Sequence, residues 1–191
     1  MPIHLFLASQ SPRRRELLRQ IGREFDVLDV DVPERREPNE TPEDYVSRVA
    51  REKAGAGLMQ VAAVHDAVVI GADTEVVLDD DVFGKPVDAA DATAMLRRLS
   101  ARSHRVLSVV WCISAGREEH ALSVSTVEFA PLTEGDIADY VATGEAFGKA
   151  GAYGIQGHAA AYIRRLDGSH SAVMGLPLHE TSLLLRRFER A

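Results

Sequence analysis

Residues 9–15 combine two serines, a proline and three arginines directly after the apolar segment 3–8. Ser11 followed by Pro12 is typical of a helix start, where the first backbone N–H groups have no partner within the helix. Such N–H groups bind phosphate well, particularly beside guanidinium groups. The segment therefore predicts an anion site. The alternative, a basic helix start without a ligand, is disfavoured because cations oppose the dipole at a helix N-terminus.

Lys53 interrupts the apolar face of the helix expected over residues 41–61. It follows Val49 and Ala50 by four and three positions, which places it on their side of the helix. A buried ammonium needs a carboxylate or a phosphate beside it, because burying an unpaired charge is costly. A long lysine can instead reach solvent at the rim of such a face. The spacing alone leaves both alternatives open.

Asp73 and Thr74 stand where the apolar strand expected over residues 67–71 gives way to polar residues. The ends of strands are common catalytic positions in α/β proteins. Many strands end in polar residues without any catalytic role, so this feature is weak by itself. Lys85 lies in a Gly-Lys-Pro sequence, which equally fits an ordinary turn.

Five of the 14 glycines fall within residues 144–157. The segment does not match a nucleotide-binding P-loop, since the spacing is one residue short and Ala150 replaces the Ser or Thr that binds magnesium. It also lacks the dinucleotide-binding pattern. His179 and Glu180 begin a zinc-protease pattern, but Leu183 stands where the second histidine belongs. These three enzyme classes are therefore excluded at the level of motifs.

The elements that must position these residues alternate between strand and helix, which predicts one mixed α/β domain over residues 1–191. Capping residues and apolar spacing predict helices over residues 12–21, 41–61, 88–99, 133–142 and 177–188. The expected strands cover residues 3–8, 25–32, 67–71, 105–114, 120–129 and 160–166, with a hairpin over residues 75–83.

The charge balance of the chain limits the kinds of partner that it can bind. The chain has 22 lysines and arginines against 29 aspartates and glutamates in 191 residues, a formal net charge of −7. This balance disfavours a nucleic-acid partner, since duplex binding depends on basic residues that neutralise phosphates. A clustered basic site can still attract an anionic small molecule.

Cys112 is the single cysteine, so no internal disulfide or cysteine-based zinc site is expected, and its apolar neighbours indicate a buried thiol. The chain shows no apolar run of the ~18 residues that cross a bilayer and no signal-peptide pattern. These features predict a cytoplasmic protein with no membrane partner.

Six segments together resemble the Maf family of nucleoside triphosphate pyrophosphatases. They are LASQSPRRRELL at 7–18, REKA at 51–54, GADTEV at 71–76, GKP at 84–86, KAGAYGIQG at 149–157 and GLPLHET at 175–181. The resemblance implies an ITPase-like mixed α/β fold of two lobes around a central cleft, a homodimer, and release of pyrophosphate that depends on a divalent cation, Mg²⁺ or Mn²⁺. It implies hydrolysis of dTTP and UTP to the monophosphate, which would clean the nucleotide pool of modified pyrimidines.

The resemblance also implies roles for single residues. Asp73 would be the catalytic base and, with Glu34, would hold the metal. The triphosphate would be held by Ser9, Arg13, Arg14, Lys53 and Lys85. Arg13, Thr74 and Gln156 match the branch of the family that acts on dTTP and UTP rather than on 7-methyl-GTP. A glutamine amide both donates and accepts, which suits the O4 and N3–H edge of uracil or thymine.

The chain departs from the family pattern at a few positions. Gly148 stands before Lys149 where the family often has aspartate, Gln10 replaces a common glycine, and Glu75 replaces a usual aliphatic residue. The loss of the carboxylate at Gly148 is the feature that favours the alternative function, a non-catalytic nucleotide-sensing or protein-binding regulator of cell division. An assay for pyrophosphate release distinguishes the two.

Overall fold

Seven strands hydrogen-bond into one sheet in the computed structural model of this chain, which describes residues 3–190. The strands are β1 (His4–Leu7), β2 (Asp26–Val27), β3 (Ala67–Leu78), β4 (Asp81–Phe83), β5 (Ser103–Ser114), β6 (Arg117–Phe129) and β7 (Ile163–Asp167). Their order is β2-β1-β3-β5-β6-β7, and β4 pairs with β3. β1 runs parallel to both β2 and β3, whereas the β3–β4 and β6–β7 pairs are antiparallel. The predicted mixed α/β class is confirmed.

The five predicted helices begin within one residue of their expected starts. The helices are α1 (Pro12–Gln20), α2 (Pro42–Gln60), α3 (Ala89–Leu99), α4 (Glu134–Ala142), α5 (His170–Met174) and α6 (Leu178–Glu189), with short 3₁₀ helices η1 (Ala150–Ala152) and η2 (His158–Tyr162). Thr41 Oγ1 accepts a hydrogen bond from the backbone N–H of Asp44 at 3.1 Å and so caps α2. Thr133 and Asp136 form a reciprocal capping box at α4.

The chain divides into two compact units, and the boundary falls inside β3, between Asp73 and Thr74. Unit 1 contains the chain up to Asp73, Ser108–Ser123 and the chain from Gly175 onward; unit 2 contains Thr74–Leu107 and Val124–Met174. The single domain over residues 1–191 and the central cleft stay predictions. Within residues 3–190, none of the helices combines the length and the apolar character that a membrane span requires.

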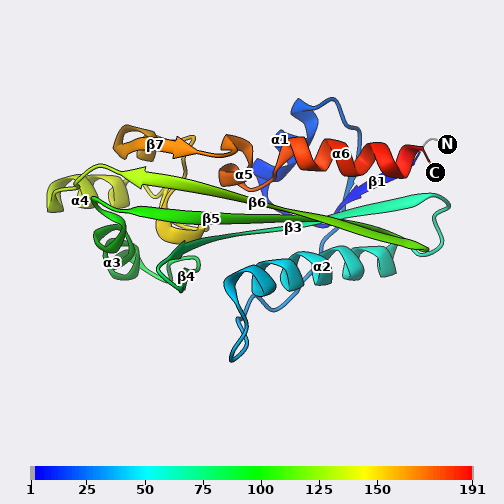
Figure 1. The fold of residues 1–191 in the computed structure, drawn as a ribbon, viewed down its shortest axis with the longest axis horizontal. Helices are drawn as coiled ribbons and strands as arrows, with labels where there is room; N and C mark the ends of the chain where they lie inside the picture. The colour runs from blue at the N-terminus through cyan, green and yellow to red at the C-terminus, as the bar shows by residue number, and fades with distance from the viewer. Residues whose placement is uncertain (1–2, 191) are drawn as a thin grey trace. The chain divides into compact units, whose positions relative to one another are not determined.

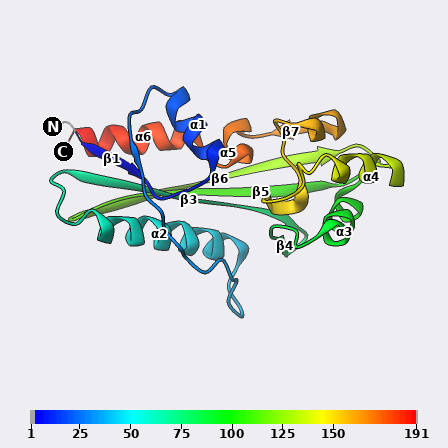
Figure 2. The ribbon, with the colours of Figure 1, turned by 180° about the vertical axis from the view of Figure 1, so that it is seen from behind.

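In unit 1, helices cover the strands on both sides. Figures 1 and 2 show α2 on one side of these strands and α1 and α6 on the other. α2 approaches β3 very closely, because a Cβ built on Gly71 would lie 2.3 Å from the backbone oxygen of Ala50 and 2.5 Å from the nitrogen of Ala54. Only glycine allows this distance. Cys112, on β5, is buried as predicted, and burial raises the pKa of its thiol to about 12.

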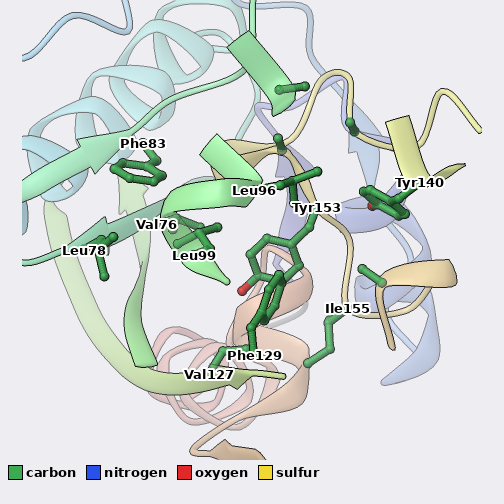
Figure 3. Close-up of a cluster of buried hydrophobic side chains, with 14 of the residues drawn as sticks. Val76, Leu78, Phe83, Leu96, Leu99, Val127, Phe129, Tyr140, Tyr153 and Ile155 are labelled. Carbon is green, nitrogen blue, oxygen red and sulfur yellow. The ribbon is translucent and has the colours of Figure 1, made fainter. Parts of the chain in front are cut away.

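Unit 2 has its own apolar core, in which aromatic rings pack edge to face (Figure 3). The rings of Phe129 and Tyr153 lie 4.9 Å apart at 73°, and His104 packs edge-on against both at 5.4 Å. The same core contains Leu96 and Leu99 of α3 and Tyr140 of α4. The core therefore reaches directly under the glycine-rich segment that carries Tyr153.

β3 corrects one prediction made from the sequence. The strand does not end at residues 71–74 but runs on to Leu78, so Asp73 lies inside a 12-residue strand and not at its end. The expected hairpin over residues 75–83 is the second half of β3 with β4. All residues of β3 except Thr74 are buried. A strand buried on both faces lacks the alternation of apolar and polar residues from which its end could be predicted.

Three other strands are shorter than expected, β1 by one residue at each end, and one helix was not foreseen. Only Asp26–Val27 of the segment 25–32 pairs as a strand, and residues 160–162 belong to η2, so that β7 begins at Ile163. The five-residue α5 has no apolar period long enough to identify from the sequence.

The Gly71 contact predicts opposite effects for two glycine substitutions at the same helix–strand pair. Gly71→Ala pushes a methyl group into the α2 backbone and lowers the free energy of unfolding by about 2–3 kcal/mol or more, the upper part of the range for overpacking. Gly55→Ala, on α2, has nothing within 4 Å and raises it by about 0.5–1 kcal/mol through helix propensity. Urea denaturation measures both; equal effects would contradict the close approach.

Candidate functional site

The buried face of α2 carries Lys53 toward β3. Val49, Ala50 and Ala54 around it are fully buried, and Gly71 lets this face touch the strand. Lys53 is itself only 7% exposed, so it does not reach solvent at the rim. Of the two alternatives left open by the spacing, the structure therefore selects the buried ammonium.

Two carboxylates bind the Lys53 ammonium. Its Nζ donates to Oε1 of Glu34 at 2.6 Å and to Oδ1 of Asp73 at 2.8 Å. Asp73 is 4% exposed, whereas the Glu34 side chain, from the loop before α2, is about a third exposed at 31%. Charge-assisted hydrogen bonds of this length offset part of the cost of burying the charges. The structure thus joins three predicted site residues that are up to 39 positions apart in the chain (Glu34 to Asp73).

The carboxylate oxygens of this cluster are ligands of the kind that divalent cations prefer. Oδ2 of Asp73 is buried and has no hydrogen-bond partner among the described residues, so it offers an unused oxygen ligand. No group of three or more His, Cys, Asp or Glu side chains gathers at metal-binding distance within residues 3–190. A pair of carboxylates nevertheless fits Mg²⁺, which proteins usually bind through one or two carboxylates together with substrate phosphates and water. Glu34 and Asp73 are therefore a suitable donor set.

A second cluster in unit 1 surrounds the start of α1. The buried Ser9 Oγ accepts from the backbone N–H of Ser11 at 3.2 Å and from the Arg14 guanidinium at 3.4 Å. Nε of Arg14 donates to the backbone oxygen of Gly175 at 2.8 Å. The structure thus brings together Ser9 and Arg14, two of the predicted site residues. The Gly175 carbonyl, which fixes the direction of Arg14, was missed; its only signal is the glycine that opens the segment 175–181.

Arg13 lies half-buried in the same first turn. Burial, and secondly the charge of Arg14, hold its pKa below the ordinary value for arginine. Two guanidinium groups at a helix N-terminus oppose both each other and the helix dipole. A polyanion bound there would relieve both repulsions, which supports the predicted anion site.

In unit 2, the turn that carries Lys85 is fastened to the glycine-rich segment. The backbone N–H of Gly151 donates to the backbone oxygen of Gly84 at 3.2 Å. Lys85 itself is exposed, and so is Gln156 at the far end of the same segment, while Thr74 is half-buried on β3. Three predicted site residues therefore belong to unit 2, and a backbone hydrogen bond joins the turn of Lys85 to the segment of Gln156.

Buried phenol groups anchor the glycine-rich segment from below. The Tyr140 hydroxyl accepts from the backbone N–H of Gly154 at 3.2 Å, and Nε2 of His104 lies 2.7 Å from the Tyr153 hydroxyl. These contacts fix the backbone just before Gln156. The sequence shows the glycines but gives no sign of these supports, because Tyr140 and His104 come from distant elements.

Gly148, the main departure from the family pattern, adopts a left-handed φ of +70°. Aspartate tolerates this conformation, and nothing lies within 4 Å of a Cβ built there. Lys149 does not need a carboxylate at position 148 to orient it, because its Nζ donates to the backbone oxygen of Glu145. The Glu145 carboxylate also accepts from the backbone N–H of His158 at 2.9 Å. Hydrogen bonds from His158, and then the charge of Lys149, lower the pKa of Glu145.

The family model described as Maf-like protein matches residues 4–188. The chain belongs to the Maf family. A protein of Xanthomonas euvesicatoria pv. vesicatoria named dTTP/UTP pyrophosphatase is 57% identical, over 96% of this chain and 98% of its own length. One of the same name from Ralstonia nicotianae is 54% identical, over 95% and 92%. A Xylella fastidiosa protein named nucleoside triphosphate pyrophosphatase is 52% identical, over 98% and 100%.

The residues implied by the Maf resemblance fall into three groups in the structure. Glu34, Lys53 and Asp73 are in direct contact in unit 1. Ser9 and Arg14 are hydrogen-bonded to each other, and Arg13 precedes Arg14 on α1, also in unit 1. Thr74, Lys85 and Gln156 belong to unit 2. Membership of the Maf family is confirmed, whereas the role of each residue stays a prediction.

The support beneath Tyr153 makes the stability of this Maf protein depend on pH. Burial lowers the pKa of His104, which is 2% exposed, to about 4; in the unfolded chain a histidine has a pKa of about 6.5. Below pH ~6.5 the unfolded state therefore takes up a proton first. The free energy of unfolding should fall by up to roughly 3 kcal/mol between pH ~6.5 and ~4 from this group.

Urea denaturation at several pH values measures this loss, with His104→Gln as the control. Glutamine does not titrate but can still hydrogen-bond the Tyr153 hydroxyl. Because carboxylates titrate in both proteins, the difference between the two pH profiles isolates His104. Parallel profiles would show that His104 is not buried in its neutral form.

Proposed function

We propose that this chain is a nucleoside triphosphate pyrophosphatase that hydrolyses dTTP and UTP to the monophosphate and pyrophosphate. The observation that carries the chemistry is the buried contact of Asp73 with Lys53 in unit 1, beside an oxygen of Asp73 that has no partner among the described residues. The substrate follows from the full-length relatives named dTTP/UTP pyrophosphatase.

Asp73 is the general base in this proposal. Before a cation binds, its Oδ1 accepts a hydrogen bond from Lys53, and its Oδ2 has no hydrogen-bond partner among the described residues. Oδ2 accepts the proton of the water that attacks the α-phosphorus. The water oxygen forms the new bond to phosphorus, and the bond to the pyrophosphate oxygen breaks.

The cationic side chains stabilise the charge that grows on the phosphates. Arg13, Arg14 and Lys85 bind phosphate oxygens, and Ser9 holds the guanidinium of Arg14 in place. Preorganised donors of this kind contribute most where negative charge develops in the transition state. The half-buried position of Arg13 strengthens its interaction with an anion, since water screens it less.

Glu34 and Asp73 hold the divalent cation, Mg²⁺ or Mn²⁺. When bound, such a cation polarises a phosphoryl oxygen and neutralises phosphate charge. Gln156 selects the base: its amide donates to O4 and accepts from N3–H of uracil or thymine. The homodimer, the cytoplasmic location and the exclusion of nucleic-acid and membrane partners stay predictions.

No observation in the described chain favours the alternative of a non-catalytic regulator. It depended on the carboxylate missing at Gly148, and Lys149 is held there by the backbone oxygen of Glu145 instead.

Asp73→Asn should cut turnover of UTP by roughly 10²–10⁴, the usual effect of a lost general base. Asparagine keeps an oxygen for the Lys53 ammonium, so nucleotide binding should persist. Pyrophosphate release with Mn²⁺ measures turnover, and calorimetry measures binding. Asp79→Asn, at an exposed aspartate between β3 and β4, is the control and should turn over normally. Normal turnover by Asp73→Asn would remove Asp73 from the role of base.

Gln156→Glu should reduce the preference for pyrimidines. A carboxylate accepts but does not donate, so it repels O4 of uracil. The ratio of kcat/KM for UTP to that for 7-methyl-GTP should fall by roughly 10- to 100-fold, the effect of replacing one hydrogen bond by a repulsive contact with a charged group. An unchanged ratio would show that the base is read elsewhere.

A further inference from the structure

The carboxylates that would hold the divalent cation already hold a cation of the chain itself. Nζ of Lys53 lies 2.6 Å from Oε1 of Glu34 and 2.8 Å from Oδ1 of Asp73. The ammonium occupies one oxygen of each carboxylate and leaves Oδ2 of Asp73 unused, so a metal ion bound to the same two carboxylates would lie beside a like charge. The two cations therefore compete for one pair of side chains.

We propose that Lys53 is a placeholder for the divalent cation: its ammonium bridges Glu34 and Asp73 until the cation binds, and it then leaves the pair. This inference rests on the proposed function, since it concerns the same site. It assigns Lys53 a positioning role, to keep the two carboxylates together, in addition to phosphate binding.

Electrostatics explains why a placeholder is needed. Asp73 is almost completely buried, and a second carboxylate beside it would repel it strongly in this poorly solvated position. Counted over Glu34, Lys53 and Asp73 alone, the ammonium reduces the formal charge from −2 to −1 and holds the pair together. A divalent cation brings the pair to zero, and the remaining negative charge therefore favours the exchange.

The form of the Lys53 side chain permits the exchange. Its stem packs on the apolar face of α2, and only the tip is held by charge. Four rotatable bonds let the ammonium move while the helix stays in place. Once Lys53 leaves the carboxylates, its ammonium needs a new anion, and a phosphate group of the substrate is the anion that the proposed reaction supplies. Cation and triphosphate should then bind cooperatively.

Isothermal titration calorimetry with Mn²⁺ alone, without nucleotide, tests the competition. Lys53→Met removes the competing ammonium and should tighten Mn²⁺ binding by about tenfold or more, from the loss of one nearby like charge. Lys53→Arg keeps the charge and should bind weakly, like the unaltered protein. Arg51→Met removes one charge from the exposed side of the same helix, where Arg51 pairs with Glu118, and should change the affinity by less than about twofold.

The double variant Lys53→Met with Glu34→Gln tests whether the tighter Mn²⁺ binding occurs at this pair. It should bind Mn²⁺ more weakly than Lys53→Met alone, because one carboxylate ligand is gone. Lys53→Met that folds and binds Mn²⁺ no more tightly than the unaltered protein would overturn the proposal, and so would an equal gain in Arg51→Met.

A second measurement uses the unaltered protein, so it stands even where Lys53→Met does not fold. The chain has only three lysines, Lys53, Lys85 and Lys149, which makes the ¹⁵N signals of the ammonium groups easy to assign with Lys53→Arg. Without metal, the buried Lys53 ammonium should give a sharp, slowly exchanging signal. Saturation with Mg²⁺ should shift or broaden it. A Lys53 signal that stays unchanged through saturation would overturn the exchange.

Neither measurement depends on hydrolysis, so the two hypotheses fail separately. Tighter Mn²⁺ binding by Lys53→Met in a protein that releases no pyrophosphate from any triphosphate would support the placeholder and refute the proposed function. Normal pyrophosphate release together with an unchanged Lys53 signal would refute the placeholder alone.

Discussion

A buried ammonium is stable only beside anions, and this constraint on Lys53 organises unit 1. It requires α2 to lie against β3, which only the missing side chain of Gly71 permits. It requires an aspartate inside a buried strand, where an unpaired carboxylate would be unstable. It also requires the loop before α2 to return Glu34 to the helix. Helix, strand and loop each contribute one side chain to this set of charges.

The charges of unit 1 are segregated in a way that suits a polyanion and its counter-cation. The side chains of Glu34, Lys53 and Asp73 sum to a formal charge of −1, whereas Arg13 and Arg14 place two positive charges in one helical turn. Neither arrangement is favourable alone: the carboxylates repel each other, and the guanidinium groups oppose the helix dipole. A triphosphate with a divalent cation supplies both missing charges. Sites that depart from local stability in this way are typically functional.

The sequence predicts the starts of the helices well, because a cap is a local interaction between residues three positions apart, as at Thr41 and Thr133. It also places Lys53 on an apolar face, since helical spacing is local. It does not identify the partners of Lys53, which come from a loop and a strand. The predicted end of β3 was wrong, because a strand buried on both faces shows no alternation of apolar and polar residues. The supports under the glycine-rich segment are equally non-local.

The two units differ in the interactions that hold their candidate residues. In unit 1, ionised groups fix one another, so the arrangement responds to any added cation or anion. In unit 2, the segment before Gln156 is fixed by neutral groups, the Tyr140 and Tyr153 hydroxyls and a histidine that burial keeps uncharged. In the proposed function, the charged groups of unit 1 would carry out the reaction, and the neutral groups of unit 2 would hold the segment that selects the base.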